Sequence, residues 1–244
     1  MERIGAIRSI CRYPVKSMAG EDLEEARVTP TGLAGDRVYA FVETDNHTSF
    51  PWMTARHGHD WIRFRPRFLD PPPSAEQSPS PERFAAEVVT PEGVRFRAGA
   101  PEFTQYLEKR FGRSLRLQFS ERSLTDAHPV SIFGLGTIRG LSEETGKDLD
   151  PRRFRANFYA QWDDDRAFFE DTLIGRQLHI GDSVTVMALE KDVRCVMITL
   201  DPDDGSPFPQ LLECVARNHG GCAGVYCTVL GEGIVRRNDP IWLI

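Results

Sequence analysis

The stretch EKDVRCVMITLDPDDG, Glu190 to Gly205, has the pattern of a β-strand that runs into a tight acidic turn, and Arg194 and Cys195 stand side by side in it. A cysteine in a strand is usually a small buried hydrophobe. A thiolate, however, is a nucleophile and a soft metal ligand, and an adjacent cation lowers the pKa of a thiol. Neighbours in a strand point to opposite faces, so Arg194 can assist Cys195 only if the strand ends or bulges there. The turn from Asp201 to Gly205 favours such an ending.

The composition is that of an ordinary globular protein of 244 residues, with 40% hydrophobic residues, 27% charged residues and a formal net charge of -6. This acidic balance argues against nonspecific nucleic-acid binding, which requires a basic face. The first residues, MERIGAIRSICRYPVKS, lack the pattern of a signal peptide, and no apolar run is long enough for a membrane segment. Five cysteines, an odd number, suggest reduced thiols, so we expect a cytoplasmic protein.

Short β-like runs separated by turn residues predict a mostly β protein of the α+β class, with few helices. Helical spacing and end signals predict helices over 101–112, 137–146 and 209–221. A strand is expected over 153–161, and a Pro- and Ser-rich loop over 70–83. We expect two lobes, a β-rich domain over 1–120 and a second β-barrel domain over 121–244.

Three further residues could bind an anion. Lys16 and Ser17 follow Pro14 at the end of a predicted strand, where a lysine beside a hydroxyl can hold a phosphate. Arg56 in MTARHGHD is a candidate anion clamp, while His57 and His59 lack an obvious third metal ligand. The alternative for each position is a solvated surface charge.

The stretch RRFRANFY offers another polar surface. If it is a strand, Arg155 and Asn157 share one face and present several donors and an acceptor to a polar ligand. The alternative is the polar outer face of an antiparallel strand. One soft thiol and several local cations in an acidic chain suggest a phosphorylated cofactor that carries sulfur or a metal.

These motifs resemble a known family along nearly the whole chain. YPVKS, GLAGDRVYAFV and MTAR resemble the N-terminal β-barrel domain that precedes MOSC domains. RFRANFY, IGDSVTV, RCVMITLDPDDG and RNDPIWL resemble the MOSC domain itself, the C-terminal fold of molybdenum cofactor sulfurase. Their order is similar to that in the mitochondrial amidoxime-reducing component and its bacterial relatives.

The resemblance implies a molybdenum–molybdopterin cofactor with Cys195 as a protein ligand of the metal and as the catalytic residue. It also implies a set of residues that contact the pterin and its phosphate or lie beside the metal ligand: Lys16, Ser17, Arg56, Arg155, Asn157, Arg194 and Asp201. The sequence departs from the family at Val193, where relatives often have serine, and at Ala156, where proline is more usual. The stretch HPVSIFGLGTIRG also lacks the Ser/Thr-rich segment of the amidoxime reducers. These departures affect the substrate pocket and some hydrogen bonds to the cofactor, but not the cysteine.

Two functions from different classes follow from the resemblance. The first is an oxidoreductase that reduces N-hydroxylated or related N-oxygenated small molecules, with electrons from a separate donor protein because no iron–sulfur cysteine spacing is present. The second is a sulfur-transfer protein that carries a persulfide on Cys195. Pyridoxal phosphate is a less favoured cofactor, because Lys109 and Lys147 lie in surface-like segments. A binding module without turnover is a third reading.

Overall fold

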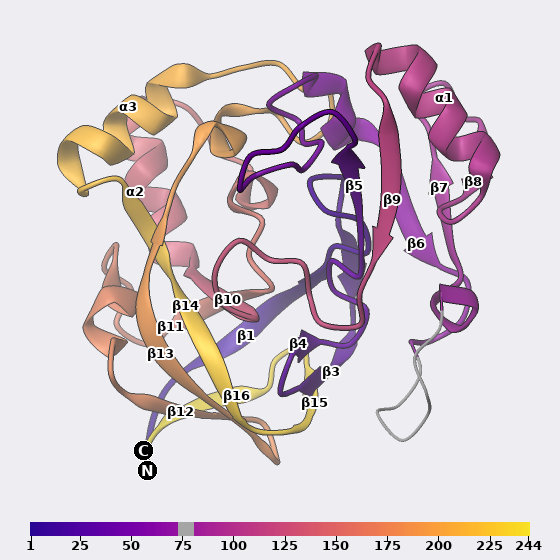
Figure 1. The fold of residues 1–244 in the computed structure, drawn as a ribbon. Helices are drawn as coiled ribbons and strands as arrows, with labels where there is room; N and C mark the ends of the chain where they lie inside the picture. Colours follow the sequence, from indigo (N-terminus) through magenta and orange to yellow (C-terminus); the bar gives the residue numbers. More distant parts are fainter. Residues whose placement is uncertain (73–80) are drawn as a thin grey trace.

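A closed β-barrel forms the centre of the computed structural model, which describes residues 1–72 and 81–244 (Figure 1). In ring order its seven strands are β1 (Glu2–Arg12), β16 (Pro240–Leu243), β12 (Gln177–Ile180), β13 (Val184–Val193), β14 (Cys222–Gly231), β10 (Val130–Gly134) and β11 (Phe158–Trp162), which pairs with β1 again. β2 (Glu21–Leu23) adds to the outer edge of β1. The prediction of a mostly β fold is confirmed.

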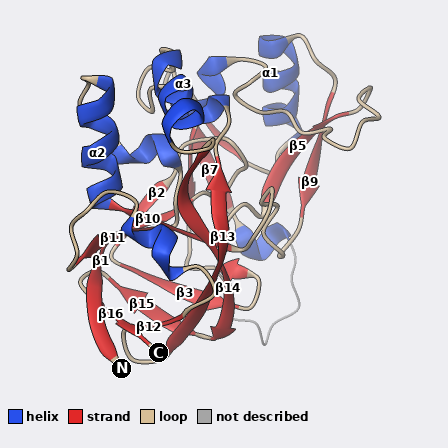
Figure 2. Cartoon of the chain, turned by 90° about the vertical axis from the view of Figure 1, so that its left-hand side faces the viewer, coloured by secondary structure: helices blue, strands red, loops and turns tan. Residues whose placement is uncertain are grey.

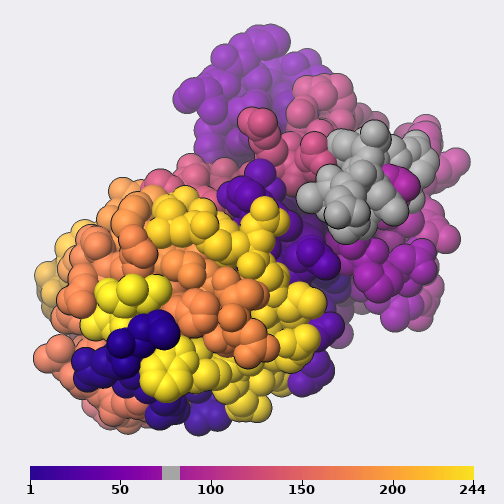
Figure 3. All heavy atoms as spheres, turned by 90° about the horizontal axis from the view of Figure 1, so that it is seen from below, coloured from indigo at the N-terminus to yellow at the C-terminus, as the bar shows by residue number. Residues whose placement is uncertain are grey.

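The first strand of the chain closes a barrel whose other strands come from the last half of the sequence. Ile10 of β1 lies opposite Phe158 of β11, and Gly5 lies opposite Ile241 of β16. Alternating apolar residues of these strands fill the barrel, and Ile10, Phe158 and Ile241 are fully buried. Consequently the two termini lie side by side at one end of the molecule, where indigo and yellow atoms meet in Figure 3.

A second unit packs beside the barrel around an aromatic core. It contains η1 (His59–Arg63), η2 (Pro81–Phe84), α1 (Pro101–Phe111) and five strands: β5 (Tyr39–Glu43), β6 (Arg65–Phe68), β7 (Ala86–Val89), β8 (Arg95–Arg97) and β9 (Leu115–Phe119). Phe41 makes edge-to-face contacts with Trp61 and Phe103 at centroid distances of 5.7 and 5.6 Å. Three short strands form a small sheet whose buried residues pack into the barrel core: β3 (Glu25–Thr29), β4 (Gly32–Leu33) and β15 (Gly233–Arg236).

The helices α2 and α3 lie at one end of the barrel, as the side view in Figure 2 shows, and three 3₁₀ turns belong to the same half of the chain. They are α2 (Leu135–Thr145), α3 (Pro209–Asn218), η3 (Pro151–Phe154), η4 (Phe169–Leu173) and η5 (Val196–Thr199). The predicted helices are confirmed within a few residues. Gly112 and Gly146 end α1 and α2 in the left-handed conformation, at φ of 64° and 65°, which glycine adopts without steric cost.

The strand predicted over 153–161 is wrong in its first half. β11 begins at Phe158, and η3 precedes it. Arg155 then turns the chain at φ of 53°, a left-handed conformation that no strand contains. Most of the loop predicted over 70–83 lies outside the described residues. The division of the chain near residue 120 stays a prediction.

Candidate functional site

A cavity of about 420 Å³ lies where the barrel meets the second unit, and it brings together distant parts of the chain. All but one of the predicted site residues line it. They are Lys16, Ser17, Arg56, Arg155, Asn157, Arg194 and Cys195. Asp201 is the exception, and its contacts are described below. A cavity of this size suits a cofactor or another small molecule.

Cys195 lies immediately beyond the end of a strand. β13 ends at Val193, and Cys195 precedes η5 with an extended backbone (φ -125°, ψ -178°). The backbone N–H of Arg194 donates to the carbonyl of Gly221 over 2.8 Å. Because strand alternation stops at Val193, Arg194 and Cys195 both reach the same cavity. The thiol is free and half-buried, and the side chains on either side, Val193 and Val196, are exposed.

Arg194 acts as an internal clamp rather than as a free cation. Its Nε donates to the carbonyl of Ala223 and its Nη1 to the carbonyl of Phe154, both over 2.7 Å. The guanidinium also packs over the Phe133 and Phe154 rings, with Cζ 5.3 and 5.7 Å from their centroids. Arg194 thereby holds β14 and the end of η3 against the segment that carries Cys195.

Lys16 is a buried cation in the lining of the cavity. Its Nζ donates to the carbonyl of Leu124 over 2.7 Å and to Oδ1 of Asp126 over 2.6 Å. Burial lowers the pKa of Lys16, and the nearby Asp126 carboxylate opposes that effect. Its neighbour Ser17 is also buried and lines the cavity.

Arg155 presents an unsatisfied donor. Its Cζ lies 4.3 Å from the centroid of the Tyr13 ring, and its Nη2 is buried without a hydrogen-bond partner in the described parts of the chain. Burial is the largest influence on the Arg155 pKa, which it lowers, and the nearby Arg37 acts in the same direction. A buried guanidinium nitrogen without a partner costs free energy that an anionic ligand would recover.

Three cavity residues share an unusual backbone conformation. Ser17, Arg37 and Arg155 have φ of 64°, 48° and 53° although none is glycine. Each such residue costs about 1–3 kcal/mol, and such strain clusters at functional sites. The strain here is concentrated where side chains from distant segments must converge.

Asn157 lines the cavity, but its amide is already used within the protein. Its Oδ1 accepts from the backbone N–H of Ser131 over 3.1 Å, and its Nδ2 donates to the carbonyl of Cys11 over 3.3 Å. The side chain is therefore placed to tie β10 to β1, below the cavity. The structure does not place it as a free donor to a ligand.

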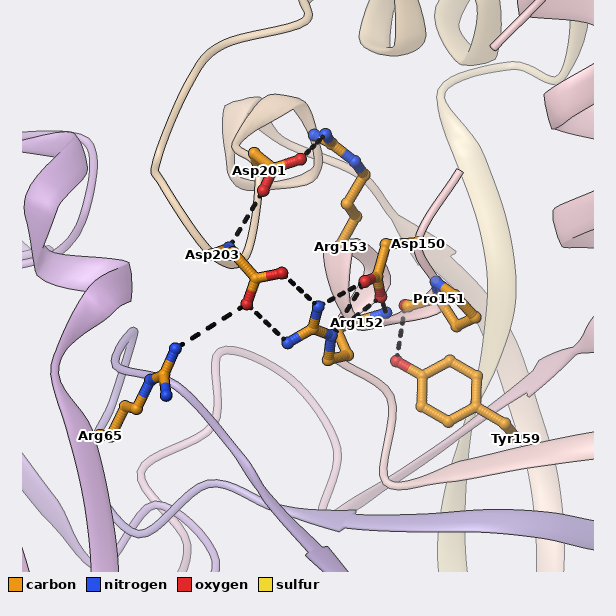
Figure 4. Close-up of polar contacts among 8 residues, drawn as sticks. All are labelled: Arg65, Asp150, Pro151, Arg152, Arg153, Tyr159, Asp201 and Asp203. Atoms are coloured by element: carbon orange, nitrogen blue, oxygen red, sulfur yellow. Dashed lines mark hydrogen bonds and ion pairs between the residues drawn. The ribbon is translucent and has the colours of Figure 1, made fainter. Parts of the chain in front are cut away.

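Asp201 lies behind the cavity instead of in its lining. Its Oδ2 accepts from Nη2 of Arg153 over 2.6 Å, as Figure 4 shows. Arg153 does line the cavity, is 1% exposed, and donates from Nη1 to the carbonyl of Thr199 over 2.8 Å. Asp201 thus acts on the cavity through Arg153.

Several lining residues were not identified from the sequence. They are Arg37, Phe50, Thr125, Asp126, His128, Ser131, Arg153, Phe154, Asp192, Met197, Ile198 and Tyr226, together with Val193. Most of them have no distinguishing local pattern, because their positions in the cavity follow from closure of the barrel. Two of them, Arg37 and Arg153, lie in stretches that the sequence analysis had singled out, GLAGDRVYAFV and RRFRANFY.

The cavity is basic although the chain is acidic. Six of its side chains are cations, namely Lys16, Arg37, Arg56, Arg153, Arg155 and Arg194, and two are carboxylates, namely Asp126 and Asp192. The whole chain has a formal net charge of -6. A local excess of buried positive charge favours an anionic ligand such as a phosphate.

The protein side chains provide no complete metal site in the described residues. No group of three or more His, Cys, Asp or Glu side chains there could hold a metal ion. His57 and His59 are exposed, and they lie in a turn and in η1. A metal held at Cys195 would need its remaining ligands from a bound cofactor. Across the part of the chain described, no helix is both long and apolar enough to cross a membrane.

Comparisons with known proteins match both parts of the chain. The model of the MOSC domain matches residues 120–242, and that of the MOSC N-terminal beta barrel domain matches residues 4–67. Mitochondrial amidoxime reducing component 2 of Homo sapiens is 24% identical over 99% of this chain and 84% of its own length, and the Macaca fascicularis protein matches equally. The crystal structure of the YUAD protein from Bacillus subtilis shares the fold, with a TM-score of 0.52 and 13% identity over 98% of this chain and 94% of that one. The chain belongs to the MOSC domain family, and it carries the MOSC N-terminal domain as well.

Proposed function

We propose that this protein binds a molybdenum–molybdopterin cofactor and reduces N-hydroxylated or related N-oxygenated small molecules. The observation that supports this most directly is one cavity that holds both the free thiol of Cys195 and the unpartnered Nη2 of Arg155. A thiolate is a suitable ligand for a polarizable metal, and a buried guanidinium suits a phosphate or a pterin oxygen. The relatives named as amidoxime reducing components support the same class of reaction.

The residues of the cavity fit this cofactor in two groups. Cys195 would ligate the metal, and Lys16, Ser17, Arg56 and Arg155 would bind the phosphate and the pterin. Arg194, Asn157 and Asp201 would support the site, because hydrogen bonds within the protein occupy Nε and Nη1 of Arg194, the amide of Asn157 and Oδ2 of Asp201. When bound, the cofactor would supply a metal centre for the two-electron reduction of the substrate.

The chain's own side chains would position the substrate at the thiol. Val193 is 72% exposed and Val196 is 38% exposed, and they flank Cys195. Such apolar surface beside a charged cavity suits a small molecule with a hydrocarbon part and one polar group. The electrons would come from a separate donor protein. The free cysteines are compatible with a reducing compartment, and we place the protein in the cytoplasm.

Sulfur transfer is the second candidate, and the accessible free thiol of Cys195 supports it. A persulfide could form on this thiol without disturbing the fold. Pyridoxal phosphate is less favoured. Lys16 is the lysine in the described lining of the cavity, and its Nζ is held by Leu124 and Asp126. A Schiff base would require Lys16 to give up both contacts and its charge.

The cofactor content of the purified protein tests the proposal. The protein is expressed in a host that makes molybdopterin, and molybdenum and pterin are measured per chain in the wild type, Cys195→Ala and Cys214→Ala. We expect stoichiometric cofactor in the wild type and in Cys214→Ala, whose thiol lies on α3 outside the cavity, and loss of molybdenum in Cys195→Ala. A wild type without metal and pterin would refute the proposal. An extra sulfur on Cys195 in the intact mass would favour sulfur transfer.

A further inference from the structure

Asp192 is a buried carboxyl group near the end of β13. It follows two exposed residues, Glu190 and Lys191, at irregular pairings with β14, and it is only 4% exposed. It also lines the cavity that contains Cys195. The second carboxylate of the described lining, Asp126, has a side chain that is 53% exposed. A buried carboxyl group facing a cavity calls for a functional explanation.

The surroundings of Asp192 hold its carboxyl group toward the cavity. Nη2 of Arg194 lies 2.7 Å from its Oδ2, although this nitrogen makes no hydrogen bond of good geometry in the described structure. The side chain of Tyr226, on the neighbouring strand β14, interacts with Asp192 and lowers the pKa of its carboxyl group, and Tyr226 also lines the cavity. Arg194 and Tyr226 thus both act on this carboxyl group.

Every charged group that faces Asp192 has a defined effect on its proton. Burial raises the pKa of Asp192, which Arg194, Tyr226 and Arg37 lower and Asp126 raises, and the net direction is upward. His128 also lines the cavity. Its Nε2 lies 3.1 Å from Oε1 of Glu190, and its ring centroid lies 5.9 Å from that of Tyr226. Asp192 can therefore carry a proton at a pH at which an exposed aspartate does not.

The proposed reaction requires protons inside this cavity. Reduction of an N–OH group breaks the N–O bond, and it consumes two electrons and two protons to give N–H and water. A separate donor protein supplies the electrons. The arginines of the cavity do not release protons, and Lys16 donates to Leu124 and Asp126. Asp192 is the buried acid that remains in the described lining.

We propose that Asp192 is the proton donor of the reduction and that Tyr226 positions it, an inference that rests on the proposed function. Asp192 gives its proton to the oxygen that leaves the nitrogen, so this oxygen departs as water. The nitrogen receives the second proton from solvent, and solvent also restores the proton of Asp192. A purely structural role, in which Asp192 neutralises Arg194, makes a different prediction for the pH profile.

Three variants of the cofactor-loaded protein test this role. Asp192→Asn removes the acid but keeps the shape of the side chain, and Tyr226→Phe removes only the hydroxyl. Asp182→Asn is the control, because Asp182 is exposed and lies just before the first residue of β13. We would first measure the molybdenum and pterin content of each variant. We would then measure kcat against pH with an amidoxime as substrate and a reduced viologen dye as electron donor. In the cofactor-free protein we would record the infrared band of a protonated carboxyl group. The infrared band reports on Asp192 without any turnover.

The expected results follow from the pKa directions. Wild-type kcat falls as pH rises through the raised pKa of Asp192, because the acid form is the active one. Asp192→Asn is expected to keep its cofactor and to lower kcat by about 100-fold to 10,000-fold. Its remaining kcat should no longer decrease as pH rises through this range. Tyr226→Phe moves the fall to higher pH, because an interaction that lowers the pKa of Asp192 is removed. Asp182→Asn follows the wild type.

The outcomes separate this inference from the proposed function. If the wild type is loaded and active while Asp192→Asn shows the same pH profile and rate, the proton-donor role is wrong and the proposed function stands. If Asp192→Asn loses its cofactor, the dependence of kcat on pH in Tyr226→Phe decides. A decrease of kcat that has moved to higher pH supports the proton-donor role of Asp192, and a decrease at the wild-type pH overturns it. A wild type without cofactor refutes the proposed function and the inference together. In that case the carboxyl band still shows whether Asp192 is protonated.

Discussion

Arg153 and Asp201 form a charged hydrogen bond of 2.6 Å that joins η3, which leads into the barrel strand β11, to the turn that follows Cys195 and η5. Arg153 is almost completely buried, whereas the side chain of Asp201 is 30% exposed. Figure 4 also shows the neighbouring ion pair of Arg152 with Asp203, whose side chains are 52% and 59% exposed. Both ion pairs join η3 to the turn after η5, but Arg153 is buried and Arg152 is exposed. Variants of the two aspartates can therefore be compared directly.

Asp201→Ala is expected to destabilise the protein by about 1.5–3 kcal/mol, because it leaves the buried guanidinium of Arg153 without its anion. Asp203→Ala removes an exposed partner and is expected to cost about 0–1 kcal/mol. Urea unfolding of both variants measures the difference. Equal midpoints would contradict the assigned roles. Since Arg153 lines the cavity, Asp201→Ala should also lower cofactor content.

Arg155→Met separates binding from stability. The substitution removes a buried donor that has no partner in the described structure, so the cofactor-free protein should be as stable as the wild type or more stable by about 1–3 kcal/mol. Pterin occupancy should fall at least about tenfold, since one charged contact is worth roughly 1.5–3 kcal/mol. Thermal unfolding and pterin analysis measure the two effects. Arg152→Met is the control, because Arg152 does not line this cavity, and normal pterin content in Arg155→Met would contradict the assignment.

Glu170 should make stability depend on pH. It is fully buried, its Oε1 accepts from the N–H of Gly134 and from Thr137 Oγ1, and burial raises its pKa above the ordinary value. A raised folded-state pKa contributes stability that is complete below the unfolded pKa and is lost as pH rises through the folded pKa. Glu170→Gln lacks this loss, so its stability relative to the wild type should increase with pH.

Urea unfolding of both proteins at a series of pH values tests this expectation. Thr137→Ala provides a second test. The hydrogen bond from Thr137 lowers the pKa of Glu170, so its removal should extend the loss of stability to higher pH. Parallel stability curves for wild type and Glu170→Gln would show that Glu170 does not titrate in this range.

Gly224→Ala should disturb the clamp formed by Arg194. Gly224 has φ of 78°, and an added Cβ would lie 2.7 Å from Cδ2 of Phe133 and 3.0 Å from Nη2 of Arg194. Gly220→Ala is the matched control, since its φ is 63° and nothing lies within 4 Å of the added atom. The control should cost about 1–2 kcal/mol from the backbone alone, and Gly224→Ala should cost a further ~1–3 kcal/mol from overpacking. Equal melting temperatures would contradict the close approach.

Local features of the fold were predictable because local chemistry specifies them. The Gly112 and Gly146 caps and the apolar spacing of α1 are encoded within a few residues of each helix. The strand predicted over 153–161 was wrong at Arg155 for a local reason as well. Alternating residue types suggested a strand there, and they did not reveal that Arg155, which is not a glycine, adopts a left-handed turn.

The sequence by itself determined the β-rich class, the helices and the identity of Cys195 as the residue to test, since each depends on short patterns or on a cluster of motifs. Only the tertiary structure decided that Lys16 and Arg155 share a cavity with Cys195. It also decided that the amide of Asn157 forms hydrogen bonds with Ser131 and Cys11, and that Asp192 is buried. These facts depend on β1 closing the barrel with strands from the other end of the chain. Burial and hydrogen-bond partners are non-local quantities, and a linear pattern does not contain them.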